Sequence, residues 1–74
     1  MSRLIRMDST GHTTLAEWTT EDAAAVERAV TAFREQLDNG YFGMVSTGEG
    51  HAEQVRELPL DADLVIMRLP ISGG

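Results

Sequence analysis

The strongest constraint on the fold comes from residues 21–38, the one segment of the sequence with a clear helical period. Its large apolar residues are spaced by four, three and four positions, which places them on one side of a helix: Val26, Val30, Phe33 and Leu37. Thr19 or Thr20 can cap the start of this helix, and the Asn-Gly pair at 39–40 is typical of a helix end. A helix with a single apolar side needs another layer to pack against, and the rest of the chain must supply it.

The remaining segments of the sequence predict strands. Apolar and β-branched runs cover residues 3–8, 13–18, 41–47, 52–58 and 64–69, and they are separated by turns rich in Gly, Ser, Asp and Pro. The run at 64–69 is the most apolar and is typical of a central strand, whereas the more polar run at 52–58 suits an edge. We therefore expect an α+β fold with one helix on a mixed sheet of four or five strands. Residues 1–70 would form this domain, and residues 71–74 would form a flexible C-terminal tail.

Composition excludes several classes of function. Twelve acidic residues against six arginines give a net charge of −6, which disfavours nucleic acid and membrane as partners. The absence of cysteine excludes disulfides and thiolate catalysis and is consistent with a cytoplasmic location. His12 and His51 lack further ligands at metal-binding spacing, and no catalytic motif is present. We expect a soluble protein that is not an enzyme and binds no metal or cofactor.

The last predicted strand also predicts a partner surface. Either Leu64 and Ile66 or the alternate residues of the run must face away from the helix, because a single helix covers only one face of the sheet. Exposed apolar side chains on a small acidic domain indicate a binding surface. We predict that this surface consists of Val65, Met67, Leu69 and Ile71.

The sequence places two glycines, Gly73 and Gly74, shortly after this strand. Glycine contributes nothing to a core and favours no regular structure, so the pair has no obvious role in stability. Pro70 lies between the strand and the glycines, where it would hold the start of the tail extended and away from the sheet.

Two stretches carry a resemblance to a known family. The segment TGHTTLAEW (residues 10–18) resembles the first hairpin of ubiquitin, and LPLDADLVIMRLPISGG (residues 58–74) resembles the end of bacterial sulfur-carrier proteins. Together with the order of elements, these stretches are similar to the β-grasp fold of ubiquitin-like proteins. The resemblance implies that a separate activating enzyme uses ATP to adenylate the carboxylate of Gly74, with Gly73 giving clearance in a narrow channel.

The resemblance leaves three functions open. The domain would be a protein modifier joined through Gly74 to target proteins, a sulfur carrier with a C-terminal thiocarboxylate, or a β-grasp interaction module that is not conjugated. We favour the modifier, whose implied partners are the activating enzyme, a transfer enzyme, a deconjugating protease and the targets. The sequence has no lysine, so we expect single attachments to other proteins rather than self-linked polymers.

Overall fold

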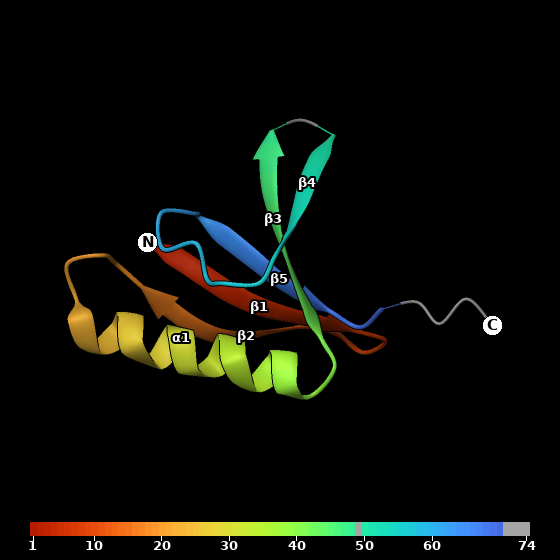
Figure 1. Ribbon diagram of the computed structural model, residues 1–74, viewed down its shortest axis with the longest axis horizontal. Coiled ribbons are helices and arrows are strands. Elements are labelled where there is room, and N and C mark those ends of the chain that lie inside the picture. Colours follow the sequence, from red (N-terminus) through yellow and green to blue (C-terminus); the bar gives the residue numbers. More distant parts are fainter. Residues whose placement is uncertain (49, 71–74) are drawn as a thin grey trace.

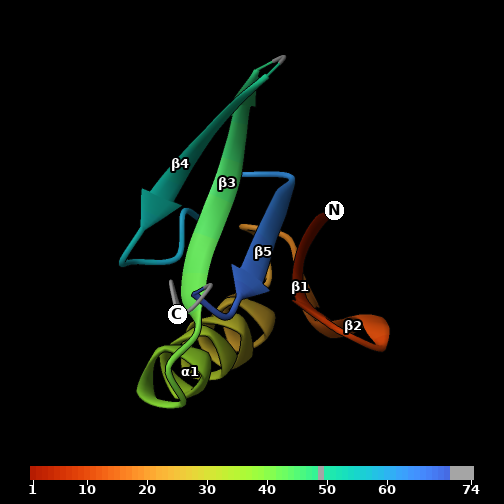
Figure 2. The ribbon, with the colours of Figure 1, turned by 90° about the vertical axis from the view of Figure 1, so that its right-hand side faces the viewer.

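The computed structural model describes residues 1–48 and 50–70. These residues form β1 (Ser2–Asp8), β2 (Gly11–Trp18), α1 (Ala23–Asp38), β3 (Phe42–Gly48), β4 (His51–Val55) and β5 (Leu64–Arg68). The strands make one five-stranded sheet in the order β2-β1-β5-β3-β4, and α1 lies on one face of it (Figure 1, Figure 2). The predicted α+β class, the single helix and the element order are confirmed. The predicted tail, residues 71–74, lies outside the described residues.

The sheet is mixed because β1 and β5 run parallel, whereas the β1–β2, β3–β4 and β3–β5 pairs are antiparallel. β5 therefore has a hydrogen-bonded neighbour on both sides, as its apolar sequence predicts, and β4 lies at an edge. Parallel pairing also fixes the direction of the chain. β1 begins at one end of the sheet, and β5 ends at the opposite end beside the turn that joins β1 to β2 (Figure 1).

The first hairpin contains an irregularity that brings extra apolar surface to the helix. Leu4 pairs with Ala16 and Ile5 pairs with Thr14, so Leu15 has no partner and bulges from β2. Leu15 and Ala16 are both half-buried against the core, although they are adjacent in sequence. Gly11 follows the turn with φ of +122°, a conformation that L-residues with side chains rarely adopt.

Helix α1 begins two residues later than the sequence predicts. The side chain of Asp22 accepts a hydrogen bond of 3.1 Å from the backbone N–H of Ala25, so Asp22 is the N-cap. The prediction of Thr19 or Thr20 as the cap is therefore wrong. The helix ends as expected, because Gly40 takes φ of +92° immediately after Asn39.

The face that α1 buries is also rotated from the predicted one. Phe33 is buried as expected. The other buried residues of the helix are Ala25, Ala29 and Gln36, which do not belong to the predicted stripe. The remaining members of the predicted stripe, Val26, Val30 and Leu37, are half-buried on the flank of the helix. Small alanines let the helix backbone approach the sheet closely, which turns the larger apolar side chains to the side.

The core lies between α1 and the covered face of the sheet. Its largest fully buried side chains are Trp18, Phe33, Leu4, Met67 and Val65. The ring of Phe33 packs directly on the backbone of Gly43 in β3, where an added Cβ would lie 2.6 Å from Phe33 Cε2. Glycine is therefore required at 43 for this close approach, and a larger residue would force the ring to move.

Candidate functional site

The face of the sheet opposite α1 carries a row of apolar side chains. Side chains alternate along a strand, and Leu4, Val65 and Met67 belong to the core beneath the helix. Their neighbours in sequence therefore lie on the opposite face, which no helix of the described residues covers. We call this surface the open sheet face, and its large apolar members are Ile5, Met7, Phe42, Met44, Leu64 and Ile66.

Strand register places the centre of the open sheet face on the three middle strands. Ile5 of β1 pairs with Ile66 of β5, and Ile66 pairs with Met44 of β3, so these side chains stand side by side. Ile5 is buried by its neighbours, and Ile66 and Met44 are half-buried. Met7 and Leu64 are each 38% exposed and extend the surface toward both ends of the sheet. These side chains form a continuous apolar strip along the open sheet face, on a protein whose net charge is −6.

Charged residues border this strip. At one end, Arg3 Nε lies 3.9 Å from Glu17 Oε2 on the neighbouring strand, and both side chains are well exposed. An exposed pair of this kind contributes little to stability because water screens it. Beside Arg68 and His51, a hollow of about 310 Å³ opens over Met44 and Ile66. The open sheet face therefore has an apolar centre and a charged border, which is the usual anatomy of a protein-binding surface.

The predicted partner surface needs a correction. Val65 and Met67 have no exposed surface, because both side chains point into the core beneath α1. The prediction that these two residues contact a partner is wrong, since a partner cannot reach them in the folded domain. The alternate residues Leu64 and Ile66 face outward instead. Leu69, which follows β5, is 51% exposed and remains available.

Leu69 and Pro70 come directly after β5, and we call these two residues the tail root. The other predicted site residues follow the tail root in the sequence. Ile71, Gly73 and Gly74 lie outside the described residues. Leu69 lines a hollow of about 380 Å³ together with Met7, Asp8, Ser9 and Arg68, so the tail root lies against the first hairpin. Met7 also belongs to the open sheet face, and the apolar strip is therefore continuous with the tail root.

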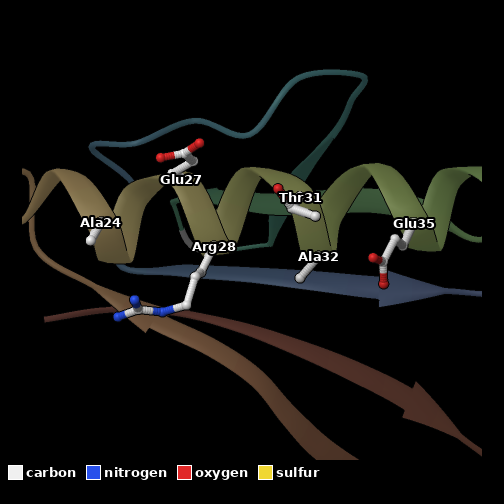
Figure 3. A pocket seen from close by; sticks show the side chains of 6 residues that line it. All are labelled: Ala24, Glu27, Arg28, Thr31, Ala32 and Glu35. Carbon is white, nitrogen blue, oxygen red and sulfur yellow. The ribbon is translucent and has the colours of Figure 1, made fainter.

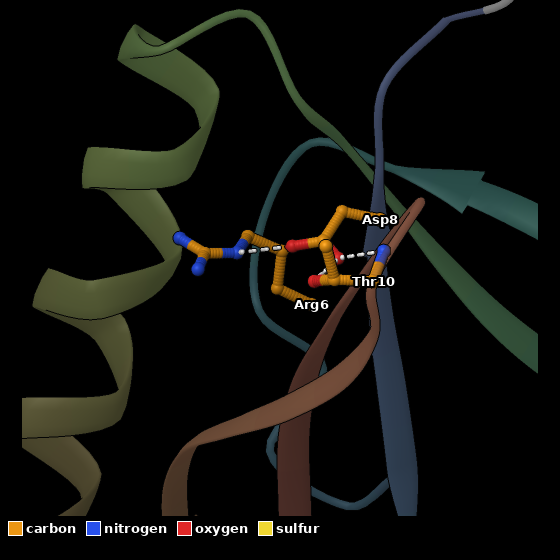
Figure 4. Close-up of polar contacts among 3 residues, drawn as sticks. All are labelled: Arg6, Asp8 and Thr10. Atoms are coloured by element: carbon orange, nitrogen blue, oxygen red, sulfur yellow. Dashed lines mark hydrogen bonds and ion pairs between the residues drawn. The ribbon is translucent and has the colours of Figure 1, made fainter.

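A polar network fixes the hairpin turn beside the tail root (Figure 4). Asp8 Oδ1 accepts hydrogen bonds from the Thr10 hydroxyl at 2.6 Å and from the Thr10 N–H at 2.9 Å. These bonds, the hydroxyl bond above all, and to a lesser extent the charge of Arg6 hold the pKa of Asp8 below its usual value. Arg6 Nε lies 3.7 Å from Asp8 Oδ2, and the guanidinium carbon lies 5.9 Å from the centre of the Tyr41 ring. These contacts hold the turn in one conformation, and the tail root lies beside it.

The sequence contains one signal that identifies the open sheet face. Arg68 has the same parity in β5 as Leu64 and Ile66, and a charged residue favours the side that reaches water. No comparable signal exists in β1, because Arg3 and Arg6 lie on opposite faces. Arg6 is tolerated on the covered side because its side chain extends toward α1 (Figure 4) and its guanidinium lies over the ring of Tyr41.

The solvent side of α1 carries a shallow depression of about 500 Å³ (Figure 3). Every residue that lines it belongs to the helix, with Ala24, Thr31 and Ala32 between charged side chains. Glu27 and Arg28 extend in opposite directions, so the charged groups do not converge on one point (Figure 3). The depression therefore offers no set of groups for catalysis or ligand binding.

Residues 1–48 and 50–70 carry neither a metal-binding cluster nor a helix that could span a membrane. Nowhere in this part of the chain do three or more His, Cys, Asp or Glu side chains gather so that they could hold a metal ion. The same residues contain no helix with the length and apolar character needed to cross a membrane.

Comparison of the chain with protein-family models, curated proteins and solved structures finds no match.

Proposed function

We propose that this domain is a ubiquitin-like protein modifier that an ATP-dependent enzyme activates at the carboxylate of Gly74 and joins to target proteins. The observation that carries the proposal is the continuity between the open sheet face and the tail root. An enzyme that binds the open sheet face would find Leu69 beside Met7 at one end of it, and the two glycines follow a few residues further along the sequence.

The tail root has the properties that such a reaction requires. Leu69 and Pro70 are exposed and follow directly from the central strand, which the sheet holds on both sides. Proline restricts its own φ and disfavours helical backbone at the residue before it, so the chain leaves β5 in extended form. The strand is held on both sides, and the extended tail root leads the chain away from it toward the glycines in sequence.

The proposed chemistry takes place on the carboxylate and not on the body of the domain. A carboxylate oxygen of Gly74 attacks the α-phosphorus of ATP, and pyrophosphate leaves, which gives an acyl adenylate. A nucleophile then attacks the carbonyl carbon, and AMP leaves with the bonding electrons. Glycine at 73 and 74 keeps the approach to that carbon free of side chains.

A sulfur carrier is the second candidate, because residues 58–74 resemble the end of bacterial sulfur carriers. The two functions share the adenylate and differ in the nucleophile. A sulfur donor would leave a thiocarboxylate on Gly74, whereas an amine on a target would leave an amide bond.

The proposal is tested by ATP–pyrophosphate exchange in fractionated extract of the cells that encode the protein. We expect exchange that depends on added wild-type protein and disappears with Gly74→Ala or with removal of residues 73–74. Ser72→Ala is the matched control in the tail and should retain exchange. Ile66→Ser should fold and yet lower exchange, because it removes an apolar contact from the open sheet face.

Two results would overturn the proposal. The first is equal exchange with wild type and Gly74→Ala, and the second is the absence of protein-dependent exchange in every fraction. Either result would favour an interaction module that is not conjugated. Where exchange occurs, the mass of the product separates the two candidates, since a thiocarboxylate exchanges oxygen for sulfur and a modifier yields a branched peptide.

A further inference from the structure

A groove lies on the covered side of the molecule, between α1 and the segment 56–60 that leads from β4 toward β5. Its volume is about 490 Å³, within the range of about 300–1,000 Å³ that is typical of binding clefts. Apolar side chains line it from both walls: Val30 and Leu37 from the helix, and Leu58 and Leu60 from the connection. We call it the helix groove.

The helix groove exists because the side of α1 that is buried on the sheet differs from the side predicted by its larger apolar residues. Ala25 and Ala29 occupy the buried side of the helix, so Val30 and Leu37 are left half-buried on the flank. Leu60 on the facing wall is 37% exposed. Leu37 packs against the core on one side, but part of its surface and of Val30 stays outside the core, and apolar surface gathered in a concavity is typical of a binding site.

The outer wall of the groove is held in place before any partner binds. The indole N–H of the buried Trp18 donates a hydrogen bond of 3.1 Å to the carbonyl of Leu60. The N–H of Ala62 donates to the carbonyl of Pro59 at 3.1 Å, which closes the turn that follows. A wall fixed in this way loses little entropy on binding, which favours affinity for a partner.

Two exposed arginines flank the apolar floor. Arg34 comes from the helix and Arg56 from the connection, and Glu57 is the one carboxylate that lines the groove with them. Neither guanidinium lies within ion-pair distance of a carboxylate in residues 1–48 or 50–70. The chain as a whole carries −6, so this groove is locally basic on an acidic protein. Its charge complements a partner that is acidic, and long-range attraction would speed the encounter.

We propose that the helix groove binds a short acidic, amphipathic peptide segment of a partner protein. Two apolar side chains of the segment would enter between α1 and residues 58–60, and its carboxylates would pair with Arg34 and Arg56. This site is separate from the open sheet face, and the proposal does not depend on activation of Gly74.

The test uses the full chain labelled with ¹⁵N and synthetic peptides of about twelve residues, a length that suits groove recognition. Each peptide carries a pair of leucines, spaced for a helix or for an extended segment, among several glutamates. We expect a peptide of this set to shift the amide signals of Val30, Leu37 and Leu60 while the open sheet face stays unchanged. Arg34→Glu combined with Arg56→Glu should weaken binding at least about tenfold, and added salt should weaken binding to the wild type.

Matched controls distinguish binding at the helix groove from a general effect of the protein's net charge. Arg28→Glu combined with Arg68→Glu changes the charge of the protein by the same amount and should leave the affinity unchanged. A peptide with lysine in place of glutamate, or serine in place of leucine, should not bind. The proposal is wrong if no acidic peptide shifts the groove signals at about 1 mM, a concentration that would detect even weak binding. It is also wrong if the lysine peptide binds equally well, or if the groove signals shift with protein concentration alone, since a second copy would then occupy the groove.

Discussion

The two faces of the sheet are built from neighbouring residues of the same strands, but they differ in what they do. On the covered face, Leu4, Val65 and Met67 have no exposed surface and pack beneath α1. On the open sheet face, Ile66 and Met44 are only half-buried, although they are similarly apolar. Residue type therefore does not separate the faces. The difference lies in the helix, which makes one face the core and leaves the other available to a partner.

The largest effect that this comparison predicts is the loss of the fold when Phe33, the aromatic side chain that α1 packs on the covered face, is removed. Phe33→Ala should cost about 3–5 kcal/mol, because it removes a fully buried ring and leaves a cavity. A single core in so small a domain supplies little more than that, so the variant should be largely unfolded. Ile66→Ala on the open sheet face is the control and should cost only about 1 kcal/mol.

Urea unfolding followed by circular dichroism measures both variants. Equal losses for Phe33→Ala and Ile66→Ala would contradict the division into a core face and an open face.

A smaller effect is expected from closing the space above the Phe33 ring. Gly43→Ala should destabilise the domain by about 1–3 kcal/mol, because its Cβ would lie 2.6 Å from Phe33 Cε2. The double variant with Phe33→Leu should be less destabilised than the sum of the single variants, since a shorter side chain leaves room for the methyl group. Additive losses of unfolding free energy would show that the two positions are not in contact.

The sequence predicts much of the framework and less of the surfaces. The helical period and the Asn-Gly pair at 39–40 predict the helix, the apolar runs between turns predict the order of the strands, and the continuous apolar run of β5 predicts its central position. These features are local in the sequence, and each of them indicates one kind of structural element.

The surfaces were harder to predict because they depend on tertiary packing. In β5 both sets of alternate residues are apolar, so hydrophobicity alone does not show which set lies beneath the helix. The prediction that Val65 and Met67 face a partner is therefore wrong, because both side chains are buried in the core. In α1 the stripe of large residues indicates a buried side centred on Val30, whereas close packing through Ala25 and Ala29 rotates the helix. That rotation creates the helix groove, which no periodicity in the sequence predicts.

The smallest effect concerns the turn that supports the tail root. Thr10→Val removes the hydroxyl bond to Asp8 and should raise the pKa of Asp8 toward its usual value. In the wild type the pKa of Asp8 is lower in the folded state than in the unfolded state. The ionised group therefore contributes stability above the unfolded pKa of about 3.9, and this contribution is lost as pH falls through the folded pKa.

An NMR titration of the Asp8 carboxyl carbon measures this change directly. Ser9→Ala, in the same turn, is the control and should leave the titration unaltered. An unchanged pKa in Thr10→Val would mean that the hydroxyl bond does not govern Asp8.

In the function that we propose, Gly74 is the reacting group and the folded body is the part that enzymes bind. The most direct measurement is mass spectrometry of this protein recovered from the cells that encode it, with sequencing of the peptides that contain residues 69–74. We predict that these peptides are joined through Gly74 to lysine or another amine of a different protein, with no self-linked chains through lysine, because the sequence has none. Peptides that always end in an unmodified carboxylate at Gly74, or that continue past it into further sequence, would contradict the claim.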